Sequence, residues 1–162
     1  MTADLPFIDE HQVLVPAPAP AVWLSLTRQL TPARLDGSRA LAYLLATDPR
    51  SVTGTPLDEG STLPGFAVSE AVPERLVRLT GHHRFSRYEL VFSLTTQLDG
   101  TLLSARSYAK FPGLHGWAYR QLVIGSGAHR VIVPRMLRAV RARATRGGVD
   151  REATASGEAI NP

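Results

Sequence analysis

The chain has 162 residues, of which 44% are hydrophobic and 20% are charged, a size and composition that fit one soluble globular domain. It contains no cysteine, which excludes disulfides, thiol nucleophiles and thiolate metal ligands and agrees with a reducing cytoplasm. The formal net charge is +4, and no apolar run approaches the roughly 20 residues that a membrane-spanning helix needs, so we expect a cytoplasmic protein without integral membrane association.

The first part of the chain predicts a strand and then helices. Apolar and polar residues alternate over Phe7–Val15, which is typical of a half-buried strand, and one face of that strand holds Phe7, His11, Val13 and Val15. A proline-rich turn follows, and the spacing of apolar residues then predicts a short amphipathic helix over about Ala19–Gln29. We expect a second short helix after Pro32, with one side formed by Leu41, Leu44 and Leu45.

The middle of the chain predicts an antiparallel sheet. A loop rich in Pro, Gly, Ser and Thr occupies Asp48–Pro64, and a further strand has room within it, between Ser51 and Leu63. Alternating residues predict four strands, at Phe66–Val72, Leu76–Gly81, Phe85–Thr96 and Thr101–Phe111. Asp99-Gly100 is a strong hairpin signal, because both residues accept the positive φ angles of such turns. One face of the strand before this hairpin holds Tyr88, Leu90, Phe92 and Leu94.

One long helix, roughly Leu114–Arg143, is expected after the sheet. Its apolar residues recur at steps of three or four, and a single histidine interrupts the stripe, which consists of Leu122, Gly125, His129, Val133, Met136 and Val140. Basic residues near the end of this helix complement its dipole, so we expect no nucleic-acid partner for Arg135, Arg138, Arg141, Arg143 and Arg146. Residues 145–162 lack apolar periodicity and are expected to form a disordered tail after a single ligand-binding domain of residues 1–144.

Three segments resemble one known family: VLVPAPAPAVWLSL, LDGTLLSARSYAKF and WAYRQLVIGSGAHRVIVPRML. They are similar to the opening strand and helix, the hairpin return and the terminal helix of the START-like, or SRPBCC, superfamily, which includes polyketide cyclases and lipid-transfer domains. The resemblance implies an α+β helix-grip fold, in which a curved antiparallel sheet wraps around a long C-terminal helix. It also implies two short helices after the first strand and a mostly apolar pocket between the sheet and the long helix.

His129 is the sharpest candidate for a polar group in such a pocket. It lies on the apolar stripe, where a histidine either meets a ligand and transfers protons near neutral pH or is a core residue satisfied by a buried partner. Aromatic residues with polar tips cluster where the sheet becomes the helix, and such residues either line ligand pockets or anchor a core. The candidate cavity residues are Tyr88, Phe92, Trp117, Tyr119, Ser126, His129, Val133 and Met136.

The sequence contains no constellation that is typical of a metal, cofactor or catalytic site. His82 and His83 are adjacent in a strand, where neighbouring side chains point to opposite faces, and no HExxH spacing occurs. No GxSxG elbow or phosphate-binding loop is present. We therefore assign no catalytic residue, expect no metal or cofactor, and leave catalysis open.

Three functional hypotheses remain. The leading one is a non-enzymatic binder or carrier of a hydrophobic small molecule such as a lipid, a polyketide or an isoprenoid, and it rests partly on the resemblance. The second is an enzyme of the cyclase, aromatase or dehydratase type that uses His129 with a tyrosine or an arginine as acid–base groups. The third is a protein-interaction module with an exposed apolar patch on its sheet or helix.

Overall fold

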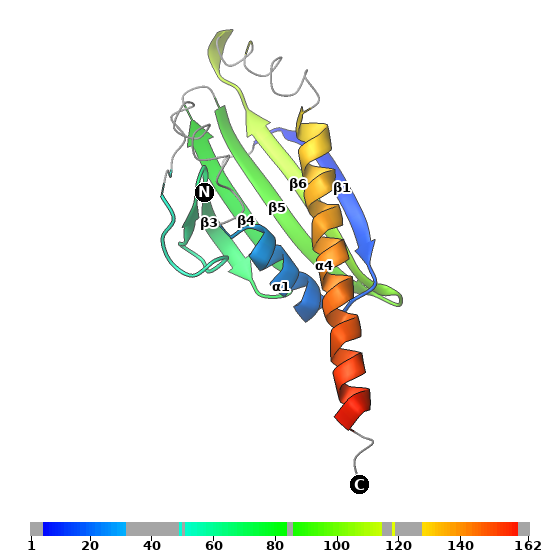
Figure 1. The fold of residues 1–162 in the computed structure, drawn as a ribbon. Coiled ribbons are helices and arrows are strands. Elements are labelled where there is room, and N and C mark those ends of the chain that lie inside the picture. The colour runs from blue at the N-terminus through cyan, green and yellow to red at the C-terminus, as the bar shows by residue number, and fades with distance from the viewer. Residues whose placement is uncertain are drawn as a thin grey trace.

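The computed structural model describes residues 5–31, 49, 51–83, 86–114, 118 and 128–158. Figure 1 shows an α+β helix-grip fold, in which a curved sheet lies against the long helix α4. The elements are β1 (Phe7–Val15), α1 (Ala19–Gln29), β2 (Thr62–Leu63), β3 (Phe66–Val72), β4 (Leu76–His83), β5 (Ser86–Gln97), β6 (Gly100–Lys110) and α4 (Ala128–Glu158). The six strands are antiparallel, in the order β1-β6-β5-β4-β3-β2.

The predicted strands and first helix are confirmed, most of them to within a residue or two. The additional strand that had room in the Ser51–Leu63 segment is β2, and Thr53 forms a further bridge to it. The second short helix, expected around Leu41–Leu45, falls outside the described residues, as does most of the segment between β6 and α4.

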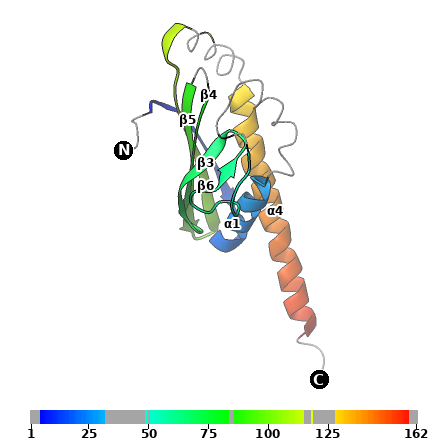
Figure 2. The same ribbon diagram turned by 90° about the vertical axis from the view of Figure 1, so that its left-hand side faces the viewer.

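Both α1 and α4 lie on the same side of the sheet, which we call the inner face (Figure 2). One row of this face runs across four strands and contains His11, Ala105, Phe92 and Val77. Ala105, Phe92 and Val77 are fully buried, as are Val22 and Leu26 of α1. From α4, the core receives Val133, Leu137, Val140 and Ala144, at most 4% exposed. Burial of these apolar surfaces is the main force that holds the helices on the sheet.

The hairpin between β5 and β6 is fastened to the end of β1. Gly100 has a φ of 133°, and a Cβ atom there would come within 2.1 Å of the Val15 carbonyl oxygen, so this position requires glycine. The next residue, Thr101, is completely buried, and its hydroxyl donates a hydrogen bond of 2.8 Å to the carbonyl oxygen of Ala17. The close contact of Gly100 with Val15 and the hydrogen bond of Thr101 to Ala17 together position the start of α1 against the sheet.

The opposite, outer face of the sheet carries a row of paired charges. Glu10, Arg106, Val91, Arg78 and Glu70 are consecutive partners across β1, β6, β5, β4 and β3. The guanidinium Nε of Arg106 lies 3.0 Å from Glu10, and that of Arg78 lies 2.9 Å from Glu70, while Arg78 also contacts Glu89. The aliphatic stems of such arginines shield apolar surface, which accounts for the burial of Val91 on this face.

Two expectations require correction. Phe7 does not share a face with His11, because the register shifts between Phe7 and Asp9; its ring is 57% exposed and packs edge-on against Tyr108 with centroids 5.8 Å apart. The long helix does not end near Arg143 but continues to Glu158, past the edge of the sheet (Figure 1). Extending an existing helix avoids the cost of nucleation, so this segment needs no apolar stripe of its own.

Candidate functional site

The candidate site is the inner face of the sheet beside α4, and four of the predicted cavity residues are described there. Phe92 and Val133 belong to the fully packed core, and Met136 is partly buried against that core. Tyr88 is half-buried on β5. Trp117, Tyr119 and Ser126 lie outside the described residues, and of His129 only its backbone position in α4 is described. The assignment of these residues to a ligand cavity stays a prediction.

Tyr88 is held in place by three neighbours. Its hydroxyl donates a hydrogen bond of 2.7 Å to the Gly65 carbonyl oxygen, and its ring packs edge-on against Phe66 with centroids 5.1 Å apart. Gly81 lies beneath this contact, where a Cβ atom would come within 2.1 Å of the Gly65 oxygen and 2.6 Å of the Tyr88 ring. The Tyr88 hydroxyl proton is therefore used in the bond to the Gly65 carbonyl oxygen. On β5, Tyr88 shares the inner face with Leu90 and Phe92.

A polar pair that was not among the predicted site residues lies on the edge strand β1. His11 Nε2 is 3.4 Å from the Asp9 Oδ2 atom, and the two side chains are 25% and 22% exposed. His11 Nε2 itself is shielded from solvent and makes no hydrogen bond with any described residue. The ladder places Asp9 opposite the buried Ser107 and His11 opposite the core residue Ala105, so both members of the pair belong to the inner face.

The sequence carried a signal for this pair. Residues two apart on a strand share a face, so Asp9 and His11 necessarily lie side by side on the face that also holds Val13 and Val15. The alternation over Phe7–Val15 predicts His11 on that face, and the same period of two places Asp9 there as well. A carboxylate two residues from a histidine on an otherwise apolar face is the pattern to look for.

Several apolar side chains of the inner face and of the two helices that cover it are only partly buried. They pack against the core without being enclosed by it, and they are Val13, Trp23, Phe66, Leu90 and Met136. A mostly apolar surface with one or two polar groups is typical of small-molecule sites, where apolar contact supplies affinity and the polar groups fix orientation. The described part of this surface has that composition, with apolar side chains and the His11–Asp9 pair.

Within the described ranges, no three His, Cys, Asp or Glu side chains gather closely enough to hold a metal ion. His82 and His83 are consecutive residues of β4 and pair with Arg87 and Ser86 across the ladder. Among the helices that the structure describes, none combines the length and apolarity needed to cross a membrane.

Comparisons with known proteins identify the fold and do not assign a family. No protein-family model and no curated protein matches the sequence. Among solved structures, a protein from Nitrosomonas europaea is similar over 92% of this chain and 99% of its own, with 14% identity and a TM-score of 0.57. A conserved protein from Geobacillus kaustophilus is similar over 85% of this chain and 94% of its own, with 16% identity and a TM-score of 0.52.

A third similar structure is that of a protein from a biosynthetic pathway. It is the di-domain ARO/CYC StfQ from the steffimycin biosynthetic pathway, with 14% identity and a TM-score of 0.50. The similarity covers 86% of this chain and 51% of StfQ, so this chain spans about half the length of that protein. At such identities the likeness establishes a shared fold, and function has to be argued from the site.

Proposed function

We propose that this protein binds a hydrophobic small molecule, such as a lipid, a polyketide or an isoprenoid, between the inner face of its sheet and α4. The observation that carries the proposal is the His11 Nε2 atom, which is shielded from solvent and has no hydrogen-bond partner among the described residues. Leaving a buried polar atom unpaired costs about 1–3 kcal/mol, so a ligand atom that hydrogen-bonds to it recovers this free energy on binding.

The imidazole of His11 and the partly buried apolar side chains around the core together define the chemical class of the ligand. Leu90 lies in the strand row that contains Asp9 and Ser107, and with the partly buried Trp23 and Met136 it offers apolar contact, which favours a ligand with a large hydrophobic body. A histidine ring nitrogen either donates a hydrogen bond to a carbonyl oxygen or accepts one from a hydroxyl. A ligand with one carbonyl or hydroxyl group would therefore provide the partner that His11 Nε2 lacks.

A second candidate function is an enzyme of the cyclase, aromatase or dehydratase type. The His11–Asp9 pair supports it, because imidazole and carboxylate side chains are common acid–base groups of such enzymes. The fold likeness to the ARO/CYC protein StfQ adds support by analogy alone. In this proposal His11 is the proton-transfer group, in addition to the His129 that the helix pattern indicated.

A thermal-shift experiment with paired ligands tests the binding proposal. Apolar ligands that carry one carbonyl or hydroxyl should raise the Tm of the full chain, and the rise should exceed that for the matching hydrocarbons. In His11→Ala the advantage of the oxygenated ligands should disappear. His82→Ala, which removes an exposed histidine from β4, should retain it. If no apolar ligand shifts the Tm of the unmodified chain, the proposal is wrong.

A turnover assay separates the two functions. Oxygenated ligands that bind should be recovered unchanged by mass spectrometry if the protein is a carrier. Conversion by the unmodified chain, lost in His11→Ala while the ligand still binds, would instead establish the enzyme.

A further inference from the structure

The side of α4 that points away from the sheet is a second surface with its own chemistry. The core residues Val133, Leu137, Val140 and Ala144 occupy one side of the helix. At about 100° per residue, the opposite side holds the exposed residues Val131, Ile132, Arg135, Arg138 and Arg146, which we call the outward face of α4. This face is independent of the candidate ligand site, because the two lie on opposite sides of the same helix.

The outward face carries a high density of positive charge. From Ala128 to Val149 the sequence contains six arginines and no acidic residue, and the next acidic residue, Asp150, comes four positions after Arg146. The Nε atoms of Arg138 and Arg146 donate to carbonyl oxygens of the helix itself, those of Pro134 and Ala142, at 3.2 and 3.1 Å. A guanidinium has five N–H donors, so each of these arginines keeps donors directed away from the helix.

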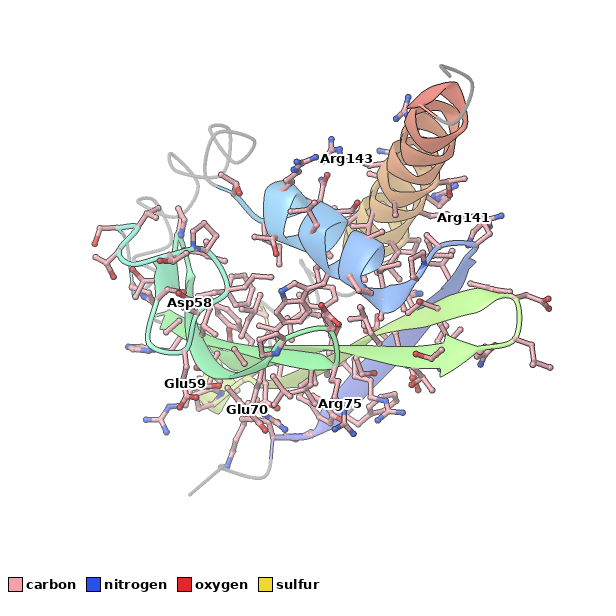
Figure 3. The ribbon with its side chains drawn as sticks, turned by 90° about the horizontal axis from the view of Figure 1, so that it is seen from below. Asp58, Glu59, Glu70, Arg75, Arg141 and Arg143 are labelled. Atoms are coloured by element: carbon pink, nitrogen blue, oxygen red, sulfur yellow. The ribbon has the colours of Figure 1, made fainter. Side chains whose placement is uncertain are left out.

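Ion pairs on the sheet involve other arginines. On its outer face, Arg106 pairs with Glu10 and Arg78 pairs with Glu70. Figure 3 shows Asp58 and Glu59 near the β2–β3 edge, on the other side of the molecule from Arg141 of α4. Arginines are therefore concentrated on α4, whereas Asp58 and Glu59 lie on the other side of the molecule.

Two large aliphatic side chains accompany these arginines. Val131 is 44% exposed and Ile132 is 62% exposed, and both lie within one turn of Arg135 on the outward face. Cations alone would suit any polyanion, including nucleic acid. Aliphatic residues beside cations suit a lipid surface, where arginines contact phosphates and aliphatic side chains enter the boundary between headgroups and acyl chains.

We propose that the outward face of α4 docks the protein on the surface of an anionic lipid bilayer. Arg135, Arg138 and Arg146 bind lipid phosphates, and Val131 and Ile132 enter the headgroup region next to them. The helix lies along the surface, so the sheet and the candidate ligand site stay on the side away from the lipid. This docking requires neither a bound ligand nor catalysis.

Co-sedimentation of the full chain with vesicles tests this proposal. The chain should bind phosphatidylcholine vesicles that contain phosphatidylglycerol, bind pure phosphatidylcholine vesicles much less, and lose affinity as salt screens the charges. A cation near such a surface is worth roughly a fivefold change in partitioning, so Arg135→Gln/Arg138→Gln should weaken binding about 25-fold. Ile132→Ser should weaken it further without altering the salt dependence.

The control is Arg75→Gln, which removes an exposed arginine of the turn between β3 and β4, away from α4 (Figure 3); this variant should bind vesicles like the unmodified chain. Circular dichroism should show that every variant keeps its fold. Equal binding to both vesicle types, no binding to either, or unchanged binding by the double variant would overturn the proposal. Salt-sensitive binding to duplex DNA without vesicle binding would also overturn it and identify nucleic acid as the partner of this face.

Discussion

Gly81→Ala should destabilise the protein, because the space beside Gly81 is already filled. The added Cβ atom would come within 2.1 Å of the Gly65 carbonyl oxygen and 2.6 Å of the Tyr88 ring. Displacing β3 or the ring to relieve this overlap costs about 1–3 kcal/mol, and losing the Tyr88–Gly65 hydrogen bond adds roughly 1 kcal/mol. The expected loss in the free energy of unfolding is therefore about 2–4 kcal/mol, measured by urea denaturation.

Two variants make this prediction specific. Tyr88→Phe removes the hydrogen bond and leaves the packing, so it should cost only about 0.5–1.5 kcal/mol. Gly147→Ala makes the same chemical change inside α4, where no atom lies within 4 Å of the new Cβ, and it should stabilise the helix by up to about 1 kcal/mol. If Gly81→Ala unfolds at the same urea concentration as the unmodified chain, the close packing of Gly65, Gly81 and Tyr88 is wrong.

Three further predictions concern the core, a buried hydrogen bond and a surface carboxylate. Phe92→Ala, at a completely buried position of the core, should cost about 3–5 kcal/mol in urea denaturation, and a loss below 1 kcal/mol would contradict its burial. Thr101→Val should cost about 1–3 kcal/mol because it leaves the Ala17 carbonyl without its 2.8 Å partner, and amide exchange near the start of α1 should accelerate; unchanged exchange would mean that this bond does not hold the helix. The pKa of Glu10 is lowered by hydrogen bonds from Ser104 and Gln12 and by Arg106, so its stabilising contribution is present above the ordinary carboxylate pKa and is lost as acid titrates the folded protein. Carboxyl NMR should show the pKa of Glu10 rising in Ser104→Ala, and an unchanged value would remove Ser104 as the main cause.

The strands were predictable because each has a local signal. Alternation over Phe7–Val15 and the Asp99-Gly100 turn depend on side-chain period and on backbone φ angles, both of which act between near neighbours in the chain. The helix α1 was equally clear from its proline at the first turn and its apolar spacing. Within α4, the same spacing placed Val133 and Val140 toward the core, where the structure has them.

The sequence by itself thus determined the order of strands and helices and the side of α4 that packs on the sheet. Only the tertiary structure decided what surrounds each side chain. The register shift that turns Phe7 outward arises from pairing with Tyr108, about a hundred positions later, and no local pattern encodes such a partner. The same pairing brings Asp9 and His11 to the inner face opposite Ser107 and Ala105. Local preferences act over a few residues, whereas the surroundings of a side chain depend on which distant segments pack against it. That is why the outward position of Phe7 and the shielding of His11 Nε2 emerged only from the folded chain.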